Sequence, residues 1–133
     1  MSETLLMIGT RKGLWLARSE DRRTWSVEGP DDPVNEIHSV AIDKRGDHPR
    51  LLMGSRSWHW GTQVLHSDDL GGSWKRGGDP AIRFPEDTGA SLEAVWSLAP
   101  SPAEPGVVWA GTEPSALWRS TDGGRSFHSF PAG

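Results

Sequence analysis

The feature that most constrains the fold is an internal repeat. Three segments share an apolar run ending in Gly-Thr or Gly-Ser, a polar loop, a second apolar run, and then Ser-x-Asp with an aromatic residue. They cover residues 4–25, 51–74 and 107–127. The glycines that anchor the copies lie 45 and 57 residues apart and are Gly9, Gly54 and Gly111. These spacings bracket the roughly 40 to 50 residues of a four-stranded propeller blade.

Two of the three copies extend further back. The runs EIHSVAID and EAVWSLAP, which begin at Glu36 and Glu93, both start 18 residues before their glycine and have the character of short strands. No segment has a convincing helical period. The expected strands are 4–10, 13–19 and 24–28 in the first copy, 36–43, 50–56, 62–68 and 73–77 in the second, and 92–99, 106–112, 115–120 and 125–130 in the third.

The predicted fold is therefore all-β. It is a partial β-propeller of about 2.75 four-stranded antiparallel blades, whereas closed propellers have about four to eight. One domain spans residues 1–133. Blade 1, about 1–30, lacks its innermost strand; blade 2 covers about 34–78 and blade 3 about 91–131.

Two turns share the pattern S-x-D-x-G-x-S-aromatic. The carboxylate of such an Asp can accept hydrogen bonds from backbone N–H groups further along the turn, and the glycine supplies a positive φ. We expect structural roles for all ten motif residues, which are Ser67, Asp69, Gly71, Ser73, Trp74, Ser120, Asp122, Gly124, Ser126 and Phe127. The first copy, residues 19–25, is one residue shorter and lacks the glycine, so we expect a different turn there.

These turns, together with GTRKGLW, DRRTW and VVWAGTEPSALWRSTDGG, resemble the Asp-box, or BNR-repeat, β-propellers. The likeness is greatest to a bacterial group described as sialidase-like or glycosyl-hydrolase-like, and it covers nearly the whole chain. It implies that each Asp-box lies between the third and fourth strands of a blade, away from the active site. It also implies that the chain is the N-terminal portion of such a propeller.

Composition excludes several classes of function. The formal net charge of −4 gives nucleic acid or an anionic membrane no bulk attraction. There is no cysteine for disulfides or thiolate chemistry, and the five histidines lack metal-ligand spacing, so we expect no cofactor and no metal site. No apolar run is long enough to span a bilayer, and the start does not resemble a signal peptide. We therefore expect a soluble protein of the cytoplasm.

The loops at one rim of a propeller are where binding residues are expected. Arg11, Arg56 and Glu113 lie two residues after their anchor glycines, where the loop between the second and third strands begins. Two arginines in equivalent positions would converge on one patch and suit a carboxylate ligand, and the resemblance implies an arginine cluster for a sugar acid. The alternative is that Arg11 and Arg56 are solvated loop charges.

Three carboxylates are candidate catalytic residues. Glu36 and Glu93 share a phase at the start of the innermost strand, and Glu113 lies on the same rim. Glycoside hydrolysis needs two carboxyl groups about 5 to 10 Å apart. The alternative is that these are channel charges holding water or ions. Sialidases use a Tyr–Glu nucleophile and this chain has no Tyr, which argues against sialidase chemistry here.

Aromatic residues suggest a ligand platform. Trp58, His59 and Trp60 lengthen one rim loop, and their rings could stack on a sugar or another flat ligand, or fold back over the blade. The long loop 78–91 could cover the channel mouth. We expect core positions for six other tryptophans, which are Trp15, Trp25, Trp74, Trp96, Trp109 and Trp118.

Two functions remain open. The first is a non-catalytic propeller module, part of a longer protein, that binds a carbohydrate, another small ligand or a partner at the rim. The second is a glycoside hydrolase, exo-sialidase-like, that holds an anionic sugar with the rim arginines and uses a rim glutamate as acid or base. In either case we expect no nucleic-acid or membrane partner, and we expect self-association or further blades to close the ring.

Overall fold

The structure is a computed structural model that describes residues 3–31, 35–57, 61–78 and 81–130. Apart from one short 3-10 turn, η1 (Glu86–Thr88), its regular elements are all strands. They are β1 (Thr4–Thr10), β2 (Gly13–Ser19), β3 (Ser26–Asp31), β4 (Glu36–Asp43), β5 (Arg50–Ser57), β6 (Gly61–Ser67), β7 (Lys75–Arg76), β8 (Ala94–Pro100), β9 (Val108–Glu113), β10 (Ala116–Ser120) and β11 (His128–Phe130). The predicted all-β class is confirmed. In the described ranges, no helix has the length and apolar character needed to cross a bilayer.

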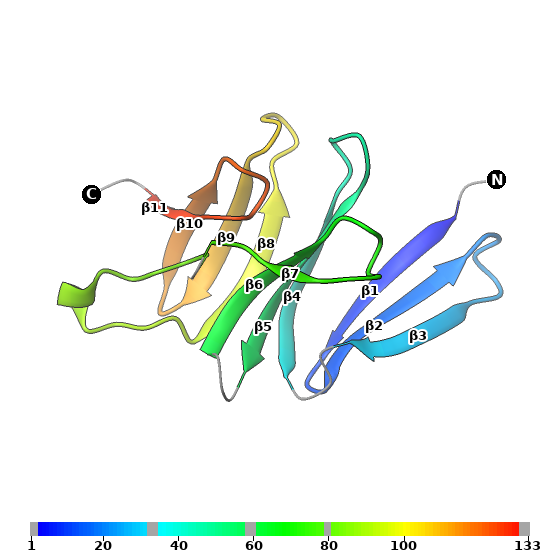
Figure 1. Ribbon diagram of the computed structural model, residues 1–133, viewed down its shortest axis with the longest axis horizontal. Helices are drawn as coiled ribbons and strands as arrows, with labels where there is room; N and C mark the ends of the chain where they lie inside the picture. Colours follow the sequence, from blue (N-terminus) through cyan, green and yellow to red (C-terminus); the bar gives the residue numbers. More distant parts are fainter. Residues whose placement is uncertain (1–2, 32–34, 58–60, 79–80, 131–133) are drawn as a thin grey trace.

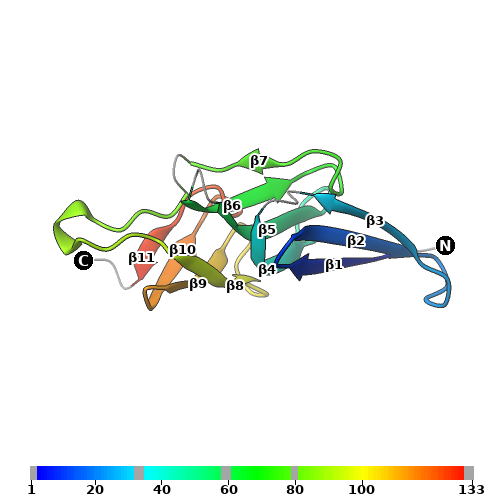
Figure 2. The same ribbon diagram turned by 90° about the horizontal axis from the view of Figure 1, so that it is seen from below.

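The strands form three antiparallel sheets in chain order. The first sheet is β1-β2-β3, the middle sheet is β4-β5-β6-β7, and the third sheet is β8-β9-β10-β11. Figure 1 shows the sheets side by side as successive blades, and in Figure 2 strands β1, β4 and β8 lie along the same side of the molecule. The fold is therefore a partial β-propeller, whose first blade has three strands where the others have four.

The hydrophobic core lies between the sheets. One buried cluster, which includes Leu14, Leu51 and Met53, fills the junction of the first and middle sheets. A second cluster, which includes Leu52 and Val95, fills the junction of the middle and third sheets. Because successive side chains of a strand point to opposite faces, β5 contributes to both clusters. The middle sheet is consequently buried on both faces.

The tryptophans are less buried than the sequence predicts. Only Trp118 is fully buried, at 3% exposure, among the six expected in the core. Trp15, Trp25, Trp74 and Trp109 are half-buried. Trp96 is 54% exposed, so its predicted core position is wrong.

Residues 81–84 of the loop after β7 pack against the third sheet, whereas the sequence suggested a loop over the channel mouth. Ala81 and Ile82 belong to the second buried cluster, and the carbonyl of Ala81 accepts a hydrogen bond from the Phe127 N–H at 2.9 Å. The ring of Phe84 packs edge-on against Trp118, with 5.1 Å between ring centroids. The apolar side chains thus draw this segment against the third sheet, which corrects the expectation from the sequence.

The Asp-box turns form as expected. The Asp69 carboxylate accepts hydrogen bonds from the hydroxyls of Ser67 and Ser73, both at 2.7 Å, and from the Ser73 N–H at 2.8 Å. The Ser67 hydroxyl oxygen accepts the Gly71 N–H at 2.8 Å. The turn of residues 120–127 repeats every one of these bonds at the corresponding positions. Each carboxylate thereby ties the two ends of its turn together.

The shorter turn of the first sheet keeps the same scheme with one residue fewer. The Ser19 hydroxyl oxygen accepts the Arg22 N–H at 2.7 Å, and the Asp21 carboxylate accepts the Thr24 N–H at 2.9 Å. Arg22 takes the left-handed conformation, at φ 62°, that glycine would favour. The hydrogen bonds of the serine and the aspartate are thus sufficient for the turn without the glycine.

The Asp-box glycines are needed for packing as well as for backbone conformation. Gly124 has a φ of 93°, and a Cβ built on it would lie 2.9 Å from Leu52 Cδ2 in the middle sheet. Gly71 has a φ of 91°, and a Cβ there would collide with Leu16 of the first sheet. Each turn therefore presses directly against a leucine of the preceding sheet.

Replacement of Gly124 by Ala should destabilise the protein by about 1–3 kcal/mol, because it combines a strained φ with a steric clash. Chemical denaturation followed by tryptophan fluorescence measures the loss. Gly46→Ala is the matched control: the nearest atom to its added Cβ lies 3.8 Å away, so stability should hardly change. Equal stability of the two variants would contradict the packing role of Gly124.

The Asp69 turn should make stability depend on acid pH. Hydrogen bonds from the Ser73 and Ser67 hydroxyls and the Ser73 N–H lower the pKa of Asp69 from 3.8 to about 2. A carboxyl whose folded pKa is depressed stabilises the protein above its unfolded pKa and loses that contribution as the pH falls through the folded value. The melting temperature should therefore fall between about pH 5 and pH 2.

Asp69→Asn removes this titration and should make the fall in melting temperature with decreasing pH shallower. Asp87→Asn, in the exposed 3-10 turn, is the control and should leave the pH dependence of the melting temperature as in the wild type. Identical slopes for wild type and Asp69→Asn would exclude Asp69 as a source of the acid sensitivity.

Candidate functional site

Strand register separates the rim from the Asp-box turns. Strand β5 pairs with β6 from Ser57 opposite Gly61, at one end, to Leu51 opposite Ser67, at the other. Arg56 therefore lies at the first end and the Asp-box turn leaves from the second. We call the end that carries Arg11, Arg56 and Glu113 the rim; it is the lower side of Figure 1.

Each rim arginine is paired with a glutamate of the next sheet. Arg11 Nε lies 3.8 Å from Glu36 Oε1, and Arg56 Nη2 lies 3.5 Å from Glu93 Oε2. Both pairs are largely exposed, so each contributes little to stability. Each arginine is thus matched with a glutamate predicted to be catalytic, and Glu36, the partner of Arg11, lies opposite Arg56 in the strand register.

Glu36 and Glu93 are not in the same register position, contrary to the prediction. Glu36 lies opposite Arg56, whereas the residue opposite Glu113 is Ala94, so Glu93 lies one residue earlier. Ser39 and Ser97, which face the anchor glycines, lie 15 and 14 residues before them. The turn between β4 and β5 is thus one residue longer than the turn between β8 and β9. For this reason Glu36 and Glu93 are both 18 residues before their glycines although they differ by one position in register.

A β-bulge in each leading strand, β4 and β8, shapes the centre of the rim. The register shifts between Ile37 and Ser39 in β4, and between Val95 and Ser97 in β8. The extra residues are His38 and Trp96. Bulges redirect side chains and are frequent next to functional sites. Here they bring two rings from neighbouring sheets together.

The two rings make one composite surface. The centroids of the His38 and Trp96 rings are 4.9 Å apart, and their planes are inclined by 34°. The His38 side chain is only 14% exposed, and its Nε2 lies 3.1 Å from Glu36 Oε2. Its Nδ1 is buried without a hydrogen-bond partner among the residues described. An exposed indole therefore lies on an imidazole that Glu36 and, through it, Arg11 hold in position.

The remaining predicted site residues are less informative. Glu113 ends β9, and its carbonyl accepts the Glu93 N–H at 2.7 Å. The carbonyl of Glu93 in turn accepts the Thr62 hydroxyl at 2.7 Å. Trp58, His59 and Trp60 lie outside the described residues. Within the part of the chain that is described, no three His, Asp or Glu side chains gather as metal ligands.

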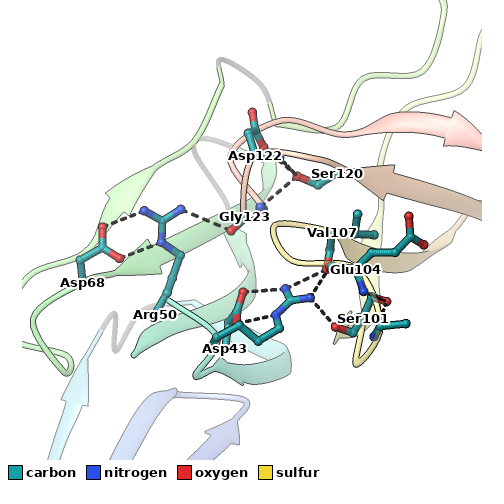
Figure 3. A network of polar contacts seen from close by, with 12 residues as sticks. Asp43, Arg50, Asp68, Ser101, Glu104, Val107, Ser120, Asp122 and Gly123 are labelled. Carbon is teal, nitrogen blue, oxygen red and sulfur yellow. Dashed lines mark hydrogen bonds and ion pairs between the residues drawn. The ribbon is translucent and has the colours of Figure 1, made fainter. Parts of the chain in front are cut away.

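A polar network at the opposite end of the sheets, beside the Asp-box turns, was not predicted from the sequence. Arg50 makes two hydrogen bonds to the Asp68 carboxylate, at 2.7 and 2.9 Å, and a longer one to the Gly123 carbonyl, at 3.4 Å (Figure 3). Arg45 is held by Asp43 at 2.7 Å and donates to the Val107 carbonyl at 2.9 Å. The carbonyls that these arginines bind lie 56 to 73 residues away in the sequence, so no local pattern could have signalled these contacts.

This network is structural. Its arginines and aspartates enclose a cavity of about 310 Å³, which Arg45, Arg50 and Asp68 help to line. The hydrogen bond from Arg45 lowers the pKa of Asp43, and the one from Arg50 lowers the pKa of Asp68. Each carboxylate therefore neutralises an arginine beside it, and the donors left over bind carbonyls of the third sheet. The two arginines therefore offer a ligand little uncompensated positive charge.

No protein-family model and no curated protein matches the chain. The exposed indole of Trp96 offers a flat apolar face, and the Arg–Glu pairs at the same rim offer hydrogen-bond donors and acceptors. This arrangement suits recognition of a ring with one apolar face and polar substituents.

Proposed function

We propose that this chain is a non-catalytic Asp-box, or BNR-repeat, propeller module of the cytoplasm that binds a ligand or partner at its rim as part of a larger ring. The BNR resemblance rests on two complete Asp-box motifs in the same phase of an independent repeat. Both turns make the full set of Asp and Ser hydrogen bonds. These observations support the family assignment of the fold and leave the reaction open.

The observation that carries the binding function is the position of Trp96. Burial of a tryptophan side chain stabilises a packed sheet. Trp96 nevertheless lies at a bulge and is 54% exposed. His38 supports one side of it, and the Glu36 carboxylate holds His38. An aromatic ring that is both exposed and supported from beneath is suited to stack on a ligand.

A carbohydrate is the ligand class that fits best. The C–H face of a sugar ring can lie on the indole while its hydroxyl groups reach the polar side chains around it. Arg11, Arg56, Glu36 and Glu93 lie at the same rim and come from all three sheets. Because each of these charges already has a partner of opposite sign, the rim suits neutral as well as anionic sugars.

Trp96→Ala should raise the dissociation constant for a bound sugar about tenfold or more, as is typical of a central aromatic contact. Saturation-transfer NMR with lactose and with 3′-sialyllactose measures binding. The melting temperature should hardly change, because the side chain is more than half exposed.

Phe130→Ala is the matched control, since Phe130 is 49% exposed and lies on β11, apart from the His38–Trp96 pair and the Arg–Glu pairs. If this variant loses binding as fully as Trp96→Ala, or if neither sugar binds the wild type, the rim is not a carbohydrate site.

A second candidate function is glycoside hydrolysis of the exo-sialidase type, supported by three glutamates at one rim beside two arginines. In this alternative, Arg11 and Arg56 bind an anionic sugar and one of Glu36, Glu93 and Glu113 acts as acid or base. Against it, Glu36 and Glu93 belong to separate ion pairs that bridge the sheets.

Release of 4-methylumbelliferone from its N-acetylneuraminic acid glycoside distinguishes the two functions. We expect no turnover by the wild type. If turnover is found and Glu93→Gln lowers it by orders of magnitude with an unchanged melting temperature, the catalytic alternative replaces the binding function.

A further inference from the structure

The two ends of the arc of sheets expose apolar faces. Cross-strand neighbours point to the same face of a sheet. In the first sheet, Leu6 lies opposite Ala17, which lies opposite Val27, and Leu6 and Val27 are 46% and 57% exposed. In the third sheet, Leu117 lies opposite both Gly111 and Phe130, and Leu117 and Phe130 are 44% and 49% exposed. We call these the first and third end faces.

The third end face has the residues that are covered at the internal junctions. The residue opposite the anchor glycine is Leu14 in the first sheet, Val64 in the middle sheet and Leu117 in the third. The next sheet covers the first two, whose exposures are 0% and 2%. Leu117 occupies the same structural position and is 44% exposed.

The surroundings of the anchor glycines also differ between the internal junctions and the third end face. A Cβ on Gly9 would lie 3.0 Å from Ile37 Cγ2, and one on Gly54 would lie 2.9 Å from Val95 Cβ, each in the next sheet. A Cβ on Gly111 would meet only Ser97, a residue of its own sheet. The hollow that receives a β-branched side chain at both internal junctions is therefore open at the third end face.

The first end face shows the converse. The position three residues before the anchor glycine is Leu6 in the first sheet, Leu51 in the middle sheet and Val108 in the third. Leu51 and Val108 are both 0% exposed, because the preceding sheet covers them, whereas Leu6 is 46% exposed. Ile8, two residues further along the same face, is 42% exposed.

The rim charges of the third and first end faces are also complementary. The two internal junctions pair a cation on one sheet, Arg11 or Arg56, with a glutamate on the next. The equivalent position at the third end face is Glu113, with the opposite charge. The first sheet carries two cations at the same end, Arg11, which also pairs with Glu36, and Lys12. A third end face and a first end face therefore match in charge as well as in apolar character.

We propose that these two end faces are a head-to-tail interface between copies of this chain, the third sheet of one copy packing on the first sheet of a second. Two copies joined in this way would bring together six sheets, within the roughly four to eight of closed propellers. The interface does not depend on any ligand at the rim.

Light scattering after size exclusion, over a wide range of protein concentration, tests the proposal. We expect a mass approaching twice the 14.6 kDa of one chain. Leu117→Glu and Leu6→Lys each place a charge in an apolar contact and should raise the dissociation constant about tenfold or more. Leu70→Glu is the control, because Leu70 is 37% exposed in a turn outside both end faces and should leave association unchanged.

Mixing the two variants tests the head-to-tail sense. An equimolar mixture of Leu117→Glu and Leu6→Lys chains can form one interface with the wild-type residues and one with paired opposite charges, so association should return. A wild type that stays monomeric at every concentration overturns the proposal and leaves the end faces to another chain. A dimer that survives either substitution, or a mixture that stays monomeric, overturns it as well.

Discussion

The close approach of neighbouring sheets at glycine is the interaction on which the rest of the structure depends. Gly54 lets the backbone of β5 lie against Val95 of the third sheet, and Gly124 lets an Asp-box turn lie against Leu52 of the middle sheet. Gly9 makes the same approach to Ile37 at the junction of the first and middle sheets, and each hydrophobic cluster fills the space at one junction. A single sheet has no core of its own, so each blade is stable only when its neighbours cover it.

The rim is a product of the same packing. Strands β4 and β8 belong to different sheets, and only the junction between those sheets brings His38 into contact with Trp96. The Arg–Glu pairs also cross junctions, as does the Arg50 contact at the opposite end. A ligand at the rim would touch two sheets at once, so binding should strengthen the contact that creates the site.

Features governed by short-range contacts could be predicted from the sequence. The Asp69 turn was predictable because its serine, aspartate and glycine interact within four residues. The strands were predictable because apolar runs alternate with turn formers. The exposure of Trp96 was not predictable, because one extra residue in β8 turns its ring out of the core. The carbonyls bound by Arg45 and Arg50 could not be predicted, because they are distant from these arginines along the chain.

The repeat, the all-β class, the three-stranded first sheet and the Asp-box turns could be predicted from the sequence, since they depend on contacts between residues close in the chain. Only the tertiary structure decided which rim charges meet, which tryptophan is exposed and which faces remain uncovered. The physical reason is register: a shift of one residue reverses the direction of every following side chain. That shift is set by packing against the neighbouring sheet, which no local pattern records.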